Sequence, residues 1–183
     1  MNFFFAVNQI NLGGVNAVSQ DELIFIADHN VGAGRKAVDM SDFYTAFSIF
    51  KHAIDFVRAV PGNFWHSHYQ FSLNLFELAC QVALPAGNLE DTYRLSDEVT
   101  QNAKCFDDTL SVTFTKILAL GFETKNAEAL DLGLVVLSRL GEAIPSNLSE
   151  RELGQMILQT QALIRGVTED TLLNHRVMTD TGS

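Results

Sequence analysis

The chain has 183 residues, of which 47% are hydrophobic and 19% are charged, and its formal net charge is −10. This length supports one domain with a hydrophobic core, and this composition excludes a disordered chain. The acidic charge disfavours nucleic acid as a partner, and the lack of a long basic run disfavours an anionic membrane surface.

The first helix expected along the chain starts in the apolar segment at the amino terminus. This segment has no basic residue before its apolar run, which stops at Asn8, so it does not have the features of a signal peptide. No stretch of about 18 uninterrupted apolar residues follows, so we expect no membrane span. Cys80 and Cys105 are too few for a disulfide framework. We therefore expect free thiols and a cytoplasmic location.

Apolar residues recur at helical spacing along almost the whole chain, and the three prolines leave long segments free to be helical. Ser19 with Glu22, and Ser149 with Glu152, have the spacing of capping boxes at helix starts. No alternating pattern long enough for a convincing strand is present. The helices predicted in chain order cover residues 3–10, 19–37, 43–57, 65–84, 89–103, 109–122, 127–140 and 149–164.

Short connections between these helices predict antiparallel helix pairs. We therefore expect an all-α fold of about seven to eight helices in one domain over residues 1–183. Residues 165–183 are expected to be an irregular tail, with one turn at 169–173.

A weak internal repeat runs through the helices. Small residues stand at Ala46, Thr92 and Ala129, each a few residues after a turn, and the intervals are 46 and 37 residues. The tetratricopeptide repeat (TPR) places small residues where its two helices cross, with an ideal period of about 34. The pattern predicts stacked antiparallel pairs in a degenerate TPR-like α-solenoid.

The segment at residues 64–71 contains His66 and His68 beside Trp65, the chain's one tryptophan. Two histidines at i and i+2 share a face on a strand, but they diverge by roughly 200° on a helix. Zinc also requires further ligands, and neither an HExxH nor a CxxC motif is present. We interpret the segment as a helix start that Asn63 caps, with no metal ligands.

A second weak motif, at residues 32–37, resembles a phosphate-binding loop. A P-loop follows a strand and places Ser or Thr after its lysine, whereas Ala37 follows Lys36 here and the preceding segment is predicted as helix. We expect the two glycines, Gly32 and Gly34, to permit close contact between helices instead.

The acidic pairs Glu90-Asp91 and Asp107-Asp108 lie near predicted helix starts, where the helix dipole favours negative charge. Cys105 lies near the same helix start, and a thiol there can have a lowered pKa. No nucleophile, base and oxyanion-stabilising set is recognisable. We therefore predict no catalytic, cofactor-binding or metal-binding residues and no cofactor.

Several short motifs occur in an order that resembles a known region of large signalling proteins. The residues that carry the resemblance are Ala33–Ala37, Trp65-x-x-His68-Tyr69, Leu78-Ala79, Gly87-Asn88, Leu132-Gly133-Leu134, Leu140-Gly141, Ile144-Pro145, Leu172-Leu173 and Met178-Thr179-Asp180. Over residues 7–180 the chain resembles the helical, TPR-like middle segment of multidomain proteins that join a protein-kinase-like domain, an AAA-type ATPase, a GAF domain and a sensor histidine kinase.

The resemblance implies a scaffold or sensor that links the ATPase to the output kinase, and it supplies no catalytic residue. The chain departs from the family pattern where Met40-Ser41 replaces a glycine turn and where 174–176 replaces a proline-containing run. Phe3, Phe4 and Phe5 are expected to be covered by upstream structure or by a partner. The chain is then either a piece of a larger parent or a short relative.

Three functional readings follow. The first is a non-enzymatic, TPR-like interaction module in signal transduction, whose partner is a protein or a neighbouring domain. The second is an enzyme fragment related to an ATPase or histidine kinase, which would bind nucleotide. The third is a helical bundle with a ligand pocket lined by Phe43, Phe47, Tyr69 and Phe71.

Overall fold

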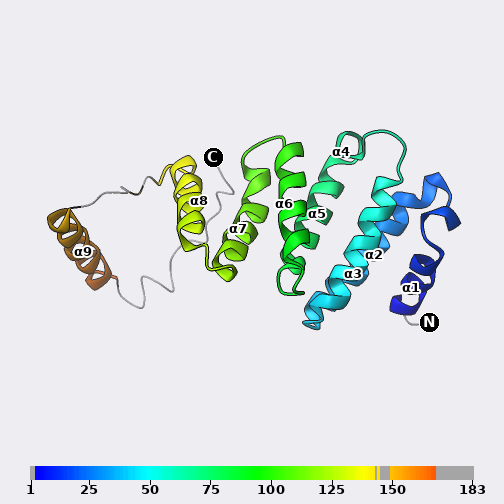
Figure 1. Ribbon diagram of the computed structural model, residues 1–183, viewed down its shortest axis with the longest axis horizontal. Helices are drawn as coiled ribbons and strands as arrows, with labels where there is room; N and C mark the ends of the chain where they lie inside the picture. Colours follow the sequence, from blue (N-terminus) through cyan, green and yellow to red (C-terminus); the bar gives the residue numbers. More distant parts are fainter. Residues whose placement is uncertain (1–2, 143, 145–148, 168–183) are drawn as a thin grey trace. The chain divides into compact units, whose positions relative to one another are not determined.

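The computed structural model describes residues 3–142, 144 and 149–167, and these residues form nine α-helices and two 3₁₀-helices without any strand (Figure 1). The all-α prediction is therefore confirmed for this part of the chain. By their contacts the residues divide into two units, 1–133 and 134–183. The prediction of a single domain stays a prediction, and the possible turn at 169–173 lies outside the described residues.

The helix boundaries agree closely with the apolar periodicity, with one exception discussed below. The elements are α1 (Phe3–Gly13), η1 (Val15–Ala17), η2 (Gln20–Glu22), α2 (Leu23–Asp39), α3 (Phe43–Arg58), α4 (Phe64–Ser67), α5 (Tyr69–Ala83), α6 (Leu89–Asn102), α7 (Asp107–Phe122), α8 (Asn126–Arg139) and α9 (Glu150–Arg165).

In unit 1 the helices pack as successive antiparallel neighbours (Figure 1). Helix α2 packs on α3 and α5 packs on α6, while α3 contacts α5 and α6 contacts α7. Helix α5 also contacts α7 directly. Helices α3, α5 and α6 thus each pack against the other helix of their own pair and against a helix of the adjacent pair.

Equivalent helices of adjacent pairs are joined by polar contacts at a nearly constant sequence separation. Arg35 of α2 donates to Asn74 of α5, 39 residues later. Ion pairs join Lys51 of α3 to Asp91 of α6, and Arg58 of α3 to Glu98 of α6, each 40 residues apart. The three-dimensional period is therefore near 40 residues, longer than the ideal TPR period of about 34.

The turn that ends α2 recurs after α5 and after α7. In each turn one residue has positive φ: Ser41 (60°), Gly87 (79°) and Thr124 (60°). The next residue donates its backbone N–H five positions back, to a carbonyl in the last turn of the helix, at 2.8–2.9 Å. This is the Schellman pattern, which satisfies carbonyls that the helix end leaves free. The residue after each positive-φ position then accepts, with its own carbonyl, the backbone N–H of the residue four positions later. These donors are the predicted anchors Ala46, Thr92 and Ala129, so each anchor lies in the first turn of the next helix.

The prediction of one continuous helix over 65–84 was wrong, because the chain breaks at His68 into α4 and α5. His68 has φ −132° and ψ 42°, outside the helical region. The break accompanies packing of the Trp65 ring against Phe76, at 5.0 Å between ring centroids, and against Tyr69 at 6.2 Å. Trp65 is buried, so the free energy gained by packing its indole outweighs the free energy of one unbroken helix here.

The core of unit 1 consists of one cluster that extends from α2 to α7. Its largest fully buried side chains include Phe50, Phe56 and Phe76. Phe4 packs against this cluster but is only partly buried, so the expectation that further structure or a partner covers it stays a prediction. Phe5 is 58% exposed, because adjacent helix positions are about 100° apart and cannot both face the core.

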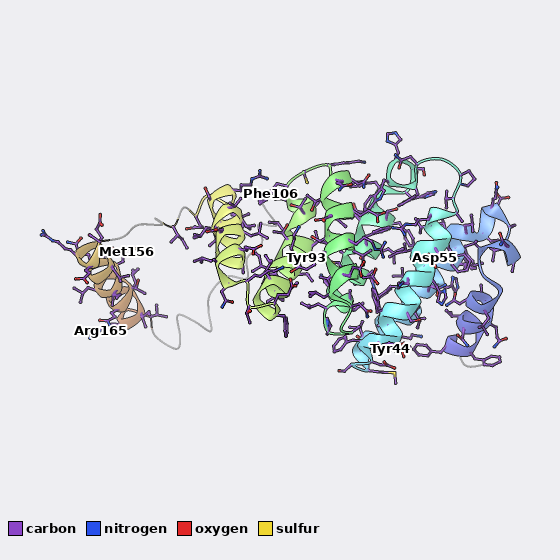
Figure 2. All side chains as sticks on the ribbon, in the orientation of Figure 1. Tyr44, Asp55, Tyr93, Phe106, Met156 and Arg165 are labelled. Carbon is purple, nitrogen blue, oxygen red and sulfur yellow. The ribbon has the colours of Figure 1, made fainter. Side chains whose placement is uncertain are left out.

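Helix α9 lies in unit 2 and starts at the predicted capping box. Ser149 accepts from the Glu152 backbone N–H at 3.3 Å, and Glu152 accepts from the Ser149 backbone N–H at 2.9 Å. None of its residues is buried, and Figure 2 shows Met156 and Arg165 projecting from it. Its apolar residues Leu153, Met156 and Ile157 are therefore exposed.

Candidate functional site

An exposed apolar groove runs along α7 in unit 1. Phe114, Leu118 and Phe122 stand one helical turn apart on α7 and are 63%, 44% and 77% exposed. They form one side of a groove of about 480 Å³, which we call the α7 groove. Its other lining residues are Gln81, Leu84, Pro85, Ser111 and Thr115.

No charged side chain lines the α7 groove. Gln81 of α5 donates to Ser111 of α7 at 2.8 Å, so a hydrogen bond between two lining residues joins the two helices at the groove. Exposed aromatic and aliphatic residues in a row are uncommon on a soluble surface unless another surface covers them. This geometry suits a helix that presents apolar residues at spacings of three and four.

A polar cluster fixes the opposite end of α7. Tyr69 of α5 donates its hydroxyl to Asp108, and it accepts the backbone N–H of Lys104 at 2.8 Å. Asp108 also accepts the backbone N–H groups of Lys104 and Cys105, at 3.2 and 3.3 Å. Asp107 and Asp108 lie in the first turn of α7, as predicted, but Asp108 accepts its hydrogen bonds from Tyr69 and from the loop before the helix.

The pKa values in this cluster follow from the same contacts. The hydrogen bond from the Tyr69 hydroxyl lowers the pKa of Asp108 below its usual value; burial opposes this shift, and hydrogen bonds from Cys105 and from the backbone N–H groups of Lys104 and Cys105 add to it. Burial, followed by the hydrogen bond to Asp108, raises the pKa of Tyr69. The ionised carboxylate and the neutral phenol therefore stabilise each other at neutral pH.

A second acidic pair has a structural role in α6. Asp91 lies in the first turn of α6 and pairs with Lys51 at 3.4 Å and with Arg94 at 2.5 Å. Burial opposes ionisation of Asp91, but the hydrogen bond and charge of Arg94 and the charge of Lys51 lower its pKa overall. Asp91 therefore joins α6 to α3 as well as favouring the helix start.

The two histidines of the 64–71 segment do not lie on one helix. His66 is exposed in α4, and His68 forms the break before α5. Asn63 precedes α4 without a side-chain capping bond, contrary to the prediction, and its carbonyl accepts from Ser67 instead. Among the described residues, no group of three or more His, Cys, Asp or Glu is placed to hold a metal ion.

The two cysteines are free and differ in environment. Cys80 is buried in α5, and burial, followed by the charge of Glu77, raises the pKa of its thiol to about 12. A protonated, buried thiol is unreactive. Cys105 is exposed in the loop before α7.

The glycines of residues 32–37 lie inside α2, which is not preceded by a strand in the described part of the chain. A Cβ built on Gly34 would lie 2.7 Å from two ring carbons of Phe50 in α3. The prediction that glycine permits close helix contact here is confirmed at Gly34.

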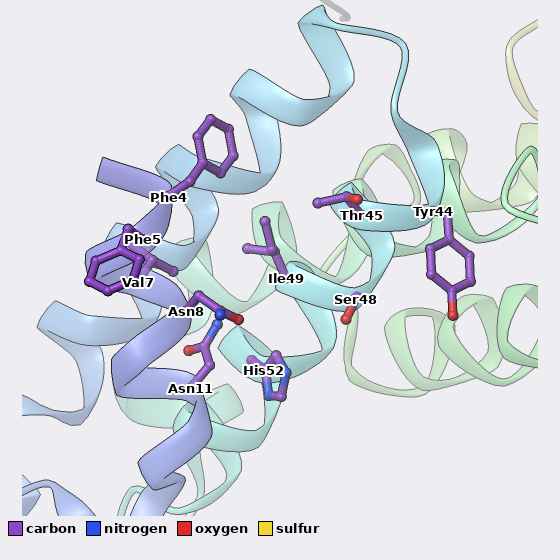
Figure 3. A pocket seen from close by; sticks show the side chains of 10 residues that line it. All are labelled: Phe4, Phe5, Val7, Asn8, Asn11, Tyr44, Thr45, Ser48, Ile49 and His52. Atoms are coloured by element: carbon purple, nitrogen blue, oxygen red, sulfur yellow. The ribbon is translucent and has the colours of Figure 1, made fainter. Parts of the chain in front are cut away.

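The four aromatic residues predicted to line a ligand pocket belong to the core instead. Phe47 is buried within the cluster, and Phe43, Tyr69 and Phe71 pack against it. Their helical spacing identified core positions, which is the commoner meaning of such a stripe. A pocket of about 450 Å³ between α1 and α3 (Figure 3) was not predicted, because its polar lining residues, which include asparagine, serine, threonine and histidine, have no distinctive spacing.

Comparison with known proteins indicates that the chain is related to a signalling protein. No protein-family model and no solved structure matches the chain. Hybrid signal transduction histidine kinase G of Dictyostelium discoideum is 25% identical over 183 residues, which is 97% of this chain and 5% of that protein. The chain thus spans about a twentieth of the length of this relative. No described helix has both the length and the apolar character needed to cross a membrane.

Proposed function

We propose that the chain is a non-catalytic, TPR-like helical interaction module of a signal-transduction protein of the ATPase–histidine kinase type. The α7 groove is the observation that carries this proposal. It is an exposed apolar surface, without charged lining residues, between packed helices. Repeat scaffolds bind proteins through surfaces of this kind between adjacent helices.

The repeated turns and the constant separation of cross-pair contacts support the scaffold part of the proposal. Arg35–Asn74, Lys51–Asp91 and Arg58–Glu98 join equivalent helices of neighbouring pairs. In solenoid repeats, each unit contacts its neighbours in this way. The period near 40 residues is longer than the ideal TPR period of about 34, so we propose a degenerate TPR-like repeat.

The similarity to a hybrid histidine kinase supports the signalling part. We propose that the occupant of the α7 groove is an amphipathic helix from a neighbouring segment of the same signalling assembly. Such a helix would place apolar residues against Phe114, Leu118 and Phe122. Its polar face would remain in water.

Site-specific photo-crosslinking tests this proposal. A photoreactive phenylalanine is placed at position 118 in the α7 groove, or at position 25 as a control. Phe25 is 64% exposed on α2 and lies outside the groove. We expect position 118 alone to crosslink, to a helical segment with apolar residues spaced by three and four. Equal crosslinking from both positions would contradict a specific groove.

The second reading, a nucleotide-binding enzyme fragment, has a separate test. The proposal predicts that a fluorescent ATP analogue does not bind the isolated chain in a titration followed by anisotropy. Saturable binding that unlabelled ATP displaces would favour the enzyme reading and reject the non-catalytic role.

A further inference from the structure

The α7 groove has acidic residues beside one of its ends. At this end Gln81 of α5 is hydrogen-bonded to Ser111 of α7. Glu77 precedes Gln81 by four positions, and Asp107 and Asp108 precede Ser111 by four and three. Residues at these spacings are neighbours on one face of a helix. The three acidic residues therefore lie one helical turn beyond the lining of the groove, and we call them the acidic end.

The opposite end of the groove has a balanced charge. Phe122 is the last lining residue of α7, about 16 Å along the helix axis from Ser111. Glu123 follows it and accepts from Lys125 Nζ at 3.2 Å and from the Tyr93 hydroxyl at 2.6 Å. Because Glu123 is paired with a cation and the acidic end is not, the groove is electrically asymmetric along its length.

No basic side chain forms an ion pair at the acidic end, as far as the described residues extend. Asp108 accepts hydrogen bonds from the Tyr69 hydroxyl and from backbone N–H groups, which are neutral donors and leave its negative charge in place. The ammonium group of Lys104 lies over the ring of Tyr69 instead, 3.9 Å from the ring centroid. The negative charge of the acidic end is therefore available to a partner.

Glu77 is the least favourably placed of these acids, because it is half-buried in α5 and faces another acid. Burial, followed by the charge of Asp108, raises the pKa of Glu77, and no basic side chain opposes this shift. The two carboxylates thus repel each other across the space between α5 and α7. A cation near both would relieve this repulsion, and partial burial would strengthen its attraction.

We propose that the helix that occupies the α7 groove is basic at one end and lies with this end against the acidic end of the groove. A Lys or Arg of that helix approaches Glu77 and Asp107, while its apolar residues pack against Phe114, Leu118 and Phe122. This inference rests on the proposed function, to which it adds the charge of the partner and its direction. Charge complementarity of this kind selects partners and fixes their register.

The test uses three synthetic helical peptides and the full chain. All carry the same stripe of leucines, placed so that it is equivalent in both directions, and they differ only in two residues at one end, which are lysine, glutamine or glutamate. Isothermal titration gives each Kd in about 0.1 M and about 1 M salt, which screen charges beyond about 10 Å and about 3 Å. In about 0.1 M salt we expect the lysine peptide to bind at least about tenfold more tightly than the glutamate peptide, and in about 1 M salt this ratio should approach one.

Two variants locate the charge that the lysines contact. Glu77→Gln keeps the size of the side chain and removes its charge, so the advantage of the lysine peptide over the glutamate peptide should fall at least about threefold. Asp28→Asn is the matched control, because Asp28 is an exposed acid of α2 outside the groove lining, and it should leave this advantage unchanged.

The direction of the bound peptide has its own measurement. A nitroxide label beside the two lysines should broaden the backbone ¹⁵N–¹H signal of Ser111 more than that of Phe122. The reverse order, or equal broadening of both signals, would overturn the inference.

The outcomes separate this inference from the proposed function. Equal affinity of the lysine and glutamate peptides, with both weakened by Leu118→Asp, would overturn the inference and leave the groove as a helix-binding site. Failure of all three peptides to bind, or equal binding by folded Leu118→Asp and the unaltered chain, would overturn both. The comparison of peptides uses the unaltered chain, so it decides the inference even where Glu77→Gln does not fold.

Discussion

The ring of Phe50 in α3 packs directly over Gly34 in α2, where a Cβ would lie 2.7 Å from two of its ring carbons. Both residues are fully buried or nearly so, and they lie in the contact between the helices of the first pair. The absence of a side chain at position 34 sets how closely α2 and α3 approach. Glycine is therefore required here by packing, since Gly34 has an ordinary helical conformation.

Gly34→Ala should destabilise unit 1 despite the higher helix propensity of alanine. The added methyl overlaps Phe50, and overpacking of a core costs about 1–3 kcal/mol. The free energy of unfolding from urea titration measures the effect. Gly121→Ala in α7 is the matched control, because no atom lies within 4 Å of its Cβ position, and it should stabilise by about 0.5–1 kcal/mol. Loss of stability in both variants, or in neither, would reject this explanation.

Ser41→Gly and Thr124→Gly should each stabilise the fold. Both residues have φ of 60° in the recurring turn, a conformation that costs a residue with a side chain about 1–2 kcal/mol. Part of this gain is offset by the greater backbone entropy of glycine in the unfolded chain, so about 0.5–1 kcal/mol should remain. Thermal unfolding checks this as an increased Tm. Gly87→Ser, at the equivalent position of the middle turn, should lower the Tm, and a Tm that rises instead would contradict the equivalence of the turns.

Tyr69→Phe should destabilise by about 1–2 kcal/mol at neutral pH, because Asp108 loses a charge-assisted hydrogen bond. The pKa of Asp108 is lowered in the folded state, so its contribution is present above the unfolded pKa of about 3.9 and is lost as pH falls through the lower folded pKa. The stability difference between wild type and Tyr69→Phe should therefore shrink below about pH 4. Tyr44→Phe is the control, since Tyr44 is 76% exposed, and it should have almost no effect. A difference that stays constant down to low pH would rule out this assignment.

Tyr93 should ionise at unusually high pH. Burial, followed by its hydrogen bond to Glu123 at 2.6 Å, raises the pKa of Tyr93 to about 12. The neutral phenol stabilises the fold below the unfolded pKa of about 10, and this contribution is lost as pH rises from about 10 to about 12. Absorbance at the phenolate band should show a group titrating near pH 12 that is missing in Tyr93→Phe. Identical titration curves for the two proteins would contradict the raised pKa.

Helix positions followed from the sequence because the apolar spacing and the capping boxes are local signals. Ser149 with Glu152 starts α9, and Asp42 accepts from Thr45 at the start of α3, close to where the pattern placed both helices. The break at His68 was not predicted, because it accompanies packing of Trp65 on Phe76 of α5, beyond the local sequence. Tertiary packing of one aromatic residue outweighed helical periodicity there.

The candidate surfaces were harder to predict than the helices. Phe114, Leu118 and Phe122 lie on a different face of α7 from the buried Val112, Thr115 and Ala119. Both sets are spaced as helical stripes, and the sequence does not distinguish a covered stripe from an exposed one. The sequence does not show that Asn11 is buried, since its side chain is positioned by a hydrogen bond to Asn30, 19 residues away. Residues that act through distant neighbours leave no local pattern.

The central claim is that the α7 groove binds a helix from the signalling assembly. Its most direct measurement is the affinity of the chain for the segment that crosslinks at position 118, used as a synthetic peptide in isothermal titration. We predict that Leu118→Asp raises the Kd at least about tenfold, whereas Phe25→Asp leaves it unchanged. Equal affinity of folded Leu118→Asp and Phe25→Asp for the peptide would contradict the claim.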